Sequence, residues 1–251
     1  MNETDTEAAK RAVAQNPVWY HTIELAPGVE TPGYVDMRPV ADRILPADLS
    51  GRRTLDVGTF DGFWAFEMER RGAEVTAIDV ERIDDAEWPP HKRAELSREV
   101  EASGVELGRG FRLASEALDS RVRRVVCNIY DLAPERISGP VDLAFIGTLL
   151  LHLRDPVRGL EAVRSVLAPG GELRLIEPFS MKLSLRSPRT AAAEFQTLHT
   201  PFNWWVPNLA ALDAWLATAG FERVRRLGIV KPPAKREMRQ RYVGMAYRPA
   251  G

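Results

Sequence analysis

A glycine turn between a strand-like run and a helical pattern is the stretch of this sequence with the clearest chemistry. Residues 53–57 form a short apolar run that breaks at Gly58, and a helical pattern begins at about Phe63. A strand, a tight glycine turn and a helix N-terminus together form a place that binds a small polar group. We predict that Asp61, which stands just before the helical pattern, caps this helix.

An acidic residue follows at the distance that is typical of nucleotide-binding folds. The apolar run 75–78 ends in Asp79, 21 residues after Gly58, and an acid about 20 residues downstream of such a turn holds a ribose diol. The turn is not a phosphate-binding P-loop, because no Gly-Lys-Ser/Thr follows it. A dinucleotide fingerprint would need glycines where Phe60 and Phe63 stand, which disfavours a nicotinamide or flavin cofactor.

The composition narrows the class of protein. The chain has 251 residues, 45% of them hydrophobic, which is enough for one large α/β domain. Its net charge of −1 gives no general attraction to nucleic acid or to a membrane surface. Cys127 is the only cysteine, so an internal disulfide and a cysteine-based zinc site are excluded, and we expect no metal. Without a signal-peptide pattern or a long apolar run, we expect a cytoplasmic protein that does not enter a membrane.

Apolar runs alternate with helical patterns along most of the chain. The first five strand-like runs are 53–57, 75–78, 122–129, 141–146 and 172–176. Such alternation predicts a parallel sheet with helices on both faces. Residues 223–230 and 241–247 then read as two further strands, the second antiparallel to the first. We therefore expect an α/β fold, a Rossmann-like, doubly wound sheet of seven strands with an antiparallel last strand.

The helical patterns and the breaks between them suggest how the chain is divided. Helices are predicted at 1–16, at 38–45, twice within 91–118, from Pro156 to about Leu167 and at 208–219. We expect residues 1–48 to form an N-terminal helical and aromatic arm. Residues 49–251 form the main domain, with a lid insertion at about 178–207.

Aromatic and polar side chains gather in the arm and in the insertion. The candidate substrate-binding residues are Tyr20, His21, His199, Asn203, Trp204 and Trp205. Aromatic residues pack in cores more often than they recognise ligands. Two such segments at one sheet edge nevertheless predict a lid that encloses a flat or apolar acceptor.

Two ionisable residues at predicted strand ends are candidate catalytic groups. His152 follows the fourth strand, where it could take a proton at neutral pH or simply bond to loop backbone. Glu177 ends the fifth strand among apolar neighbours. It could act as a base, bind a substrate cation, stabilise a carbocation or form a salt bridge to the lid.

Four stretches of the sequence occur together in one family of enzymes. They are Leu55-Asp56-Val57-Gly58, the strand that ends at Asp79, the Pro169-Gly170-Gly171 turn and the Gly220-Phe221 pair. Together they resemble the class I methyltransferases that use S-adenosylmethionine (SAM), over roughly residues 50–248. The resemblance implies that SAM is the cofactor and that residues 49–251 are the methyltransferase domain.

The resemblance also implies a set of cofactor contacts. The candidate cofactor-binding residues are Gly58, Phe60, Asp61, Asp79, Val80, Ile129, Tyr130 and Gly147. Ile129 and Tyr130 would lie beside the adenine. Phe60 replaces the middle glycine of the family, so the methionine end of SAM would meet an aromatic wall.

A closer likeness is carried by three further stretches. Residues 42–46, 152–156 and 205–207 are similar to the tRNA wobble-uridine carboxymethyltransferases, which use carboxy-SAM. That subfamily has a tyrosine just before the histidine, where this chain has Leu151. Ordinary SAM is therefore expected.

The basic clusters bear on the choice of acceptor. Arginines and lysines at 121–124, 223–226 and 231–241 are either a solvated face or a phosphate-binding surface. The near-neutral charge favours a small acceptor, aromatic or phosphorylated, over RNA. We expect methyl transfer to such an acceptor. The alternatives are a tRNA wobble-uridine methyl- or carboxymethyltransferase and a non-catalytic SAM-binding module.

Overall fold

Five parallel strands form the centre of the fold. The computed structural model describes residues 3–200, 202–236 and 240–250. The parallel strands are β3 (Arg53–Val57), β4 (Glu74–Asp79), β5 (Arg123–Val126), β6 (Val141–Gly147) and β7 (Leu167–Pro178). β3 pairs with β4 and β6, β4 with β5, and β6 with β7, all in parallel. Their carboxyl ends therefore meet at one edge, which we call the carboxyl edge of the sheet.

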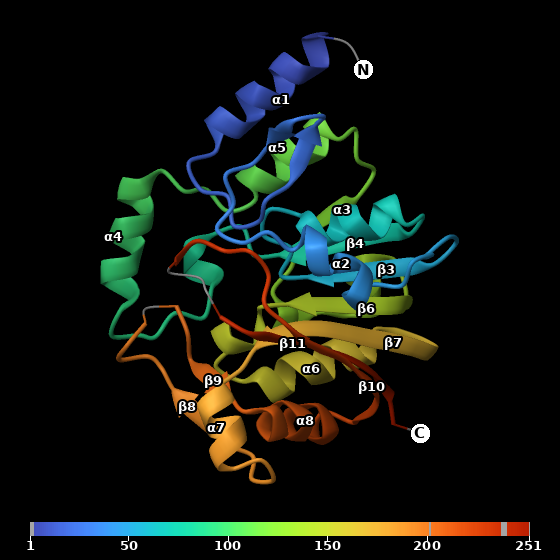
Figure 1. The fold of residues 1–251 in the computed structure, drawn as a ribbon, viewed down its shortest axis with the longest axis vertical. Helices are drawn as coiled ribbons and strands as arrows, with labels where there is room; N and C mark the ends of the chain where they lie inside the picture. Colours follow the sequence, from blue (N-terminus) through green and yellow to red (C-terminus); the bar gives the residue numbers. More distant parts are fainter. Residues whose placement is uncertain (1–2, 201, 237–239, 251) are drawn as a thin grey trace.

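Two antiparallel strands complete the sheet. They are β10 (Phe221–Val230) and β11 (Tyr242–Pro249), and among the described residues the sheet has seven strands in the order β10–β11–β7–β6–β3–β4–β5 (Figure 1). β11 lies between β10 and β7 and runs antiparallel to both, with Tyr242 opposite Pro178. The predicted seven-stranded sheet with an antiparallel last strand is confirmed.

Helices cover both faces of this sheet, as the alternation of elements predicts. One face packs on α2 (Arg38–Ile44), α3 (Phe63–Arg70) and α5 (Arg109–Ala117), and the other on α6 (Pro156–Ser165) and α8 (Leu209–Thr218). α1 (Glu3–Gln15) packs on α5. α4 (Arg93–Ser103) lies to the left of the sheet in Figure 1. The Asp155 side chain caps α6 by accepting the Arg158 N–H, with Pro156 in the first turn.

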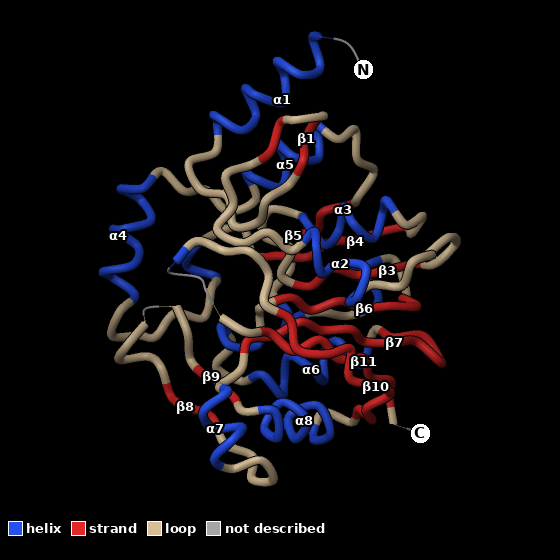
Figure 2. Tube along the Cα trace, viewed as in Figure 1, coloured by secondary structure: helices blue, strands red, loops and turns tan. Residues whose placement is uncertain are grey.

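Short elements connect the main ones, as the tube view shows (Figure 2). They are β1 (Glu24–Ala26) and β2 (Val29–Glu30) in the arm, α7 (Met181–Arg186), β8 (Ala193–Phe195) and β9 (Trp205–Pro207) in the insertion, and the 3₁₀ turns η1 (Ile83–Asp85), η2 (Ile129–Asp131), η3 (Pro134–Ile137) and η4 (Leu150–His152). No helix of the described residues has the length and apolar character that crossing a membrane requires.

Three expectations about local structure were wrong. The third parallel strand ends at Val126, because the Asn128 side chain accepts the Tyr130 N–H and starts η2. The fifth strand is longer than expected, and the Pro169-Gly170-Gly171 turn lies within its bounds. Asp61 is not a helix cap, since α3 begins after Gly62 without any side-chain cap.

Candidate active site

The glycine turn after β3 brings backbone close to the carboxyl edge. Gly58 has a φ of 75°, in the left-handed region that favours glycine. A Cβ at this position would lie 3.0 Å from Cδ1 and Cδ2 of Leu149, which belongs to the loop after β6. The turn and this loop are therefore in close contact, and a side chain larger than hydrogen at Gly58 would force them apart.

Asp79 fixes the shape of the turn from the next strand. Its carboxylate accepts the Phe60 N–H at 2.8 Å and the Val80 N–H at 2.8 Å. Burial raises the pKa of Asp79 above its ordinary value, although the two backbone bonds oppose this shift. A carboxylate has about four acceptor positions, so two remain for another donor pair such as a ribose diol.

Asp61 joins the turn to the N-terminal arm. Its carboxylate accepts the Tyr20 N–H at 2.9 Å and the His21 N–H at 2.7 Å, and it lies 2.6 Å from the His21 Nδ1. Asp61 is 1% exposed and His21 is 6% exposed. The acid that the sequence suggested as a cap thus holds two of the candidate substrate-binding residues over the turn. The His21 ring stacks on Phe63, with centroids 5.2 Å apart.

The arm is also held from the other side by the connection between β10 and β11. Val35 forms bridges with both His21 and Ala234. The Asp36 N–H bonds to the Pro233 carbonyl and the Lys235 N–H to the Tyr34 carbonyl, both at 2.8 Å. Segments from the start and from near the end of the chain therefore meet at the carboxyl edge. Residues 237–239 of the basic cluster 231–241 lie outside the described residues.

The predicted adenine side holds the buried Ile129, the half-buried Tyr130 and a crowded glycine. Ile129 is 7% exposed. The Tyr130 hydroxyl lies 2.5 Å from Glu87 Oε2 and accepts the Asp155 N–H at 3.1 Å, so its polar atom is engaged within the protein. A Cβ at Gly147 would lie 3.0 Å from the indole nitrogen of Trp64, and only glycine leaves room at the end of β6.

Glu177 is buried without an opposite charge. It is 1% exposed, and its Oε1 accepts the Leu149 and Leu150 N–H groups at 2.8 and 3.0 Å. The suggested salt bridge to the lid does not form among the described residues. Burial raises the pKa of Glu177 from 4.5 to about 8. Its carboxyl group therefore supports the loop that carries Leu149, and it retains a proton at neutral pH.

We expect Glu177→Gln to flatten the fall in stability between about pH 5 and pH 8. In this window folded Glu177 keeps a proton that the unfolded chain has released, because its pKa is about 8 when folded and 4.5 ordinarily. Stability therefore falls as pH rises, by up to about 1.4 kcal/mol per pH unit for one proton. Burial also raises the pKa of Asp56 to about 7, so part of the slope remains.

Urea unfolding near pH 5 and near pH 8 measures this effect. The comparison needs the wild type, Glu177→Gln and a control, Glu135→Gln, at an exposed position. The control should follow the wild type. Equal slopes for all three proteins would show that Glu177 is not the titrating group.

His152 is oriented by the insertion. Its Nδ1 lies 2.8 Å from the Phe202 carbonyl oxygen, which can only accept, so Nδ1 carries the proton and Nε2 keeps its lone pair. Burial lowers the pKa of His152 below its ordinary 6.5. The ring is therefore neutral near pH 7, in the tautomer that can accept a proton at Nε2.

The other candidate residues in the insertion differ in their burial and in their hydrogen bonds. Trp204 is buried, and its indole N–H donates to the Glu87 carbonyl at 2.6 Å, while the Trp205 indole donates to the Arg154 carbonyl at 3.2 Å. His199 is exposed and Asn203 is half-buried.

The two predicted lid segments occupy different places along the edge. The arm contacts the glycine turn and the β10–β11 connection, whereas the insertion contacts the loop between β6 and α6. In Figure 2 β1 of the arm lies near the top and β8 and β9 lie at the lower left.

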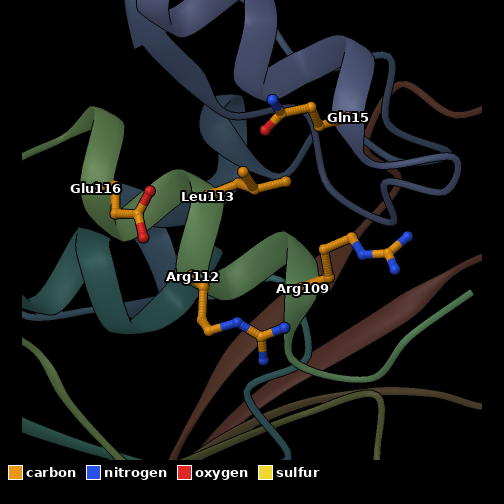
Figure 3. Close-up of a pocket in the computed structure, with 5 residues that line it drawn as sticks. All are labelled: Gln15, Arg109, Arg112, Leu113 and Glu116. Carbon is orange, nitrogen blue, oxygen red and sulfur yellow. The ribbon is translucent and has the colours of Figure 1, made fainter.

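Two surface hollows lie near the site, and the second is lined in part by the candidate site residues Tyr130 and Trp205. One, of about 340 Å³, lies between α1 and α5, and its lining residues are Gln15, Arg109, Arg112, Leu113 and Glu116 (Figure 3). Both of its arginines pair with Glu106, and in Figure 3 their side chains point in different directions. The other, of about 690 Å³, lies behind Tyr130, between α6, Trp205 and Trp215.

Three residues at the edge were missed by reasoning from the sequence. Leu149 packs on Gly58, and Thr148 and Tyr242 lie beside the Tyr20 hydroxyl. A signal existed for Tyr242, since a last strand antiparallel to β7 must begin where β7 ends. No pattern in the sequence points to Thr148 or Leu149.

Solved structures share this arrangement of strands. An N1-methyltransferase from Burkholderia thailandensis, bound to 1,6-didemethyltoxoflavin and S-adenosylhomocysteine, superposes with a TM-score of 0.56 at 19% identity, covering 86% of this chain and 78% of that one. A SAM-dependent methyltransferase from Methanosarcina mazei gives 0.55 at 19% identity, covering 86% of this chain and all of the other, 100%. At these identities the likeness shows the fold.

Curated sequences give closer matches over part of their length. The tRNA U34 carboxymethyltransferase of Azotobacter vinelandii is 30% identical over 188 residues, which are 73% of this chain and 50% of that protein. The ubiquinone biosynthesis O-methyltransferase of Xanthomonas oryzae pv. oryzae is 34% identical over 128 residues, 51% of this chain and 44% of that one. The chain spans about half the length of the curated relatives it matches.

A family profile covers most of the domain built around the glycine turn. Residues 34–226 match the family described as methyltransferase domain. That range contains β3 to β7, the turn at Gly58 and the acid at Asp79. The chain therefore belongs to the methyltransferase domain family.

Proposed function

We propose that this domain transfers a methyl group from SAM to a small-molecule acceptor bound at the carboxyl edge, under the N-terminal arm. The observation that carries the proposal is the buried Asp61, which ties the arm to the glycine turn through Tyr20 and His21. An arm held in this way encloses whatever the turn binds, and it excludes water from the reacting groups.

The residues at the turn fit SAM. Gly58 leaves a cradle that a Cβ would narrow against Leu149, and Asp79 has acceptor positions left for a ribose diol. Ile129 offers an apolar surface for an adenine ring. Phe60 takes the family's glycine position with a φ of 47°, so its backbone follows the glycine path despite its side chain.

The protein's own contribution is alignment and proton transfer. When bound, SAM supplies a methyl group on a sulfonium, which is a good leaving group. The rate of an in-line displacement is raised mainly by holding the two reactants close together and correctly aligned. His152 is neutral with a free Nε2, so it is our candidate for removing a proton from an oxygen or nitrogen acceptor. Glu177 holds the loop that lies against the turn.

A tRNA wobble-uridine modifier is the second candidate. The curated relatives named tRNA U34 carboxymethyltransferase support it, at 30% identity over 73% of this chain. Against the use of carboxy-SAM stands Leu151, which is 5% exposed and apolar where that subfamily has a tyrosine. Binding to tRNA should weaken steeply and linearly with the logarithm of salt concentration, whereas a small acceptor should show little salt dependence.

We expect Asp79→Ala to weaken SAM binding at least about tenfold, the effect of losing one or two charge-assisted hydrogen bonds together with the shape of the turn. Calorimetric titration with SAM, S-adenosylhomocysteine and carboxy-SAM measures it. Asp84→Ala, at an exposed residue a few positions away, is the matched control and should bind like the wild type. If Asp79→Ala binds SAM as tightly as the wild type, Asp79 does not contact the ribose. If the wild type does not bind SAM, the proposed function is wrong.

A further inference from the structure

Polar side chains from four segments meet at the carboxyl edge next to the turn. Tyr20 reaches over from the arm, Thr148 follows β6, Glu177 stands near the end of β7 and Tyr242 opens β11. Tyr20 lies beside Thr148 and Tyr242, and Tyr242 is close enough to Glu177 to sense its charge. We call these four residues the polar cage.

One hydroxyl of the polar cage lacks a partner. The Tyr20 oxygen is sealed from solvent, and no described residue gives it a hydrogen bond of acceptable geometry, although Tyr242 and Thr148 lie next to it. A buried polar atom without a partner is costly and rare in native proteins. Thr148 adds backbone strain, with a φ of 56° in a non-glycine residue. Unsatisfied atoms and strain of this kind cluster at ligand sites.

The polar cage contains no lysine or arginine, and its acidic groups hold their protons near pH 7. Burial raises the pKa of Tyr20 and of Tyr242, and it raises the pKa of Glu177 to about 8. Asp61 also faces Tyr20, but its carboxylate is taken up by His21 and two backbone N–H groups. An anion that entered the cage would find no positive charge, and burying an unpaired charge is expensive.

We propose that the polar cage is the acceptor subsite and that it takes an uncharged hydrogen-bonding group on a ring. Suitable groups are the hydroxyl or carbonyl of a phenol, quinone or pyrimidine. A carboxylate or a phosphate group is rejected. This inference rests on the proposed methyl transfer at the same edge and names the class of acceptor. Tyr20 is then the residue that bonds to the ligand atom and orients it.

The experiment titrates two sets of rings, each a neutral methyl ester and the matching carboxylate, into protein saturated with S-adenosylhomocysteine. One set is methyl 3,4-dihydroxybenzoate and 3,4-dihydroxybenzoate, and the other is methyl orotate and orotate. In at least one set the neutral member should bind about tenfold or more tighter than its charged partner. Calorimetry gives the affinities without any need for turnover.

Three variants separate recognition from stability. Tyr20→Phe and Tyr242→Phe should each weaken the neutral ligand about tenfold, which is about 1.4 kcal/mol, and leave S-adenosylhomocysteine affinity unchanged. Tyr20→Phe should not lower the melting temperature, because its hydroxyl has no partner to lose. Tyr34→Phe is the control, since Tyr34 belongs to the same arm but stacks under Lys235.

Some results would contradict the inference about the acceptor, and another would contradict the proposed function. Tighter binding of the charged rings, no binding of any neutral ring, or equal affinities in Tyr20→Phe and the wild type would overturn the inference. If the wild type does not bind S-adenosylhomocysteine, the proposed function itself is wrong.

Discussion

Replacing Asp61 by alanine is expected to lower the free energy of unfolding by about 3 to 5 kcal/mol, because each buried donor that loses its acceptor costs about 1 to 3 kcal/mol. The change leaves two backbone N–H groups and the His21 Nδ1 without their acceptor in a site where Asp61 is 1% exposed. Urea unfolding followed by tryptophan fluorescence measures the loss. Limited proteolysis should then cut within residues 17–36, which the carboxylate no longer holds.

Two further variants test whether the effect comes from these hydrogen bonds. Asp61→Asn keeps one acceptor oxygen for the backbone N–H groups and should lose less stability than Asp61→Ala. Asp48→Ala, at an exposed acid outside the site, should unfold like the wild type. If Asp61→Ala stays within about 1 kcal/mol of the wild type, the arm is held mainly by its apolar contacts and not by Asp61.

Gly58→Val is expected to weaken SAM binding by at least about a hundredfold, or roughly 2.7 kcal/mol. The backbone there has a φ of 75°, which a β-branched residue adopts only with strain. A Cβ would also lie 3.0 Å from two terminal carbons of Leu149, so this side chain would have to shift away from the turn. Calorimetric titration with SAM gives the affinity.

Gly51 is a control that separates the effect of backbone strain from the effect of contact with Leu149. Gly51 has a φ of 71°, and nothing lies within 4 Å of where its Cβ would be. Gly51→Val should therefore show the backbone cost as lower stability, without weaker SAM binding. Equal losses of SAM affinity in the two variants would mean that the Gly58 effect is a general consequence of instability.

Much of the architecture could be predicted because it follows from local patterns. Near-continuous apolar runs such as 141–146 mark strands that are covered on both faces, and the Asp155-Pro156 pair marks the start of a helix. The alternation of strands and helices then limits the topology to a doubly wound sheet. The positions of Gly58 and Asp79 at the carboxyl edge follow from that topology alone.

The contacts across the edge could not be predicted, because they join residues far apart in sequence. Asp61 has the sequence context of a helix cap, yet its partners Tyr20 and His21 lie about 40 positions earlier. The left-handed backbone at Phe60 and Thr148 leaves no trace in residue type, since neither is a glycine, asparagine or aspartate. Such choices are made by tertiary packing, which local propensity does not contain.

The position of β11 has a consequence for the order of assembly during synthesis. β11 follows β10 in the chain, yet it lies between β10 and β7 and joins the two. Until residues 242–249 have left the ribosome, β10 has no strand to pair with and the Tyr242 side chain is not yet beside Glu177. The edge of β7 is then open to pairing with strands of other chains. A growing chain can therefore shape the glycine turn early, but its sheet is complete only after residues 242–249 have been made.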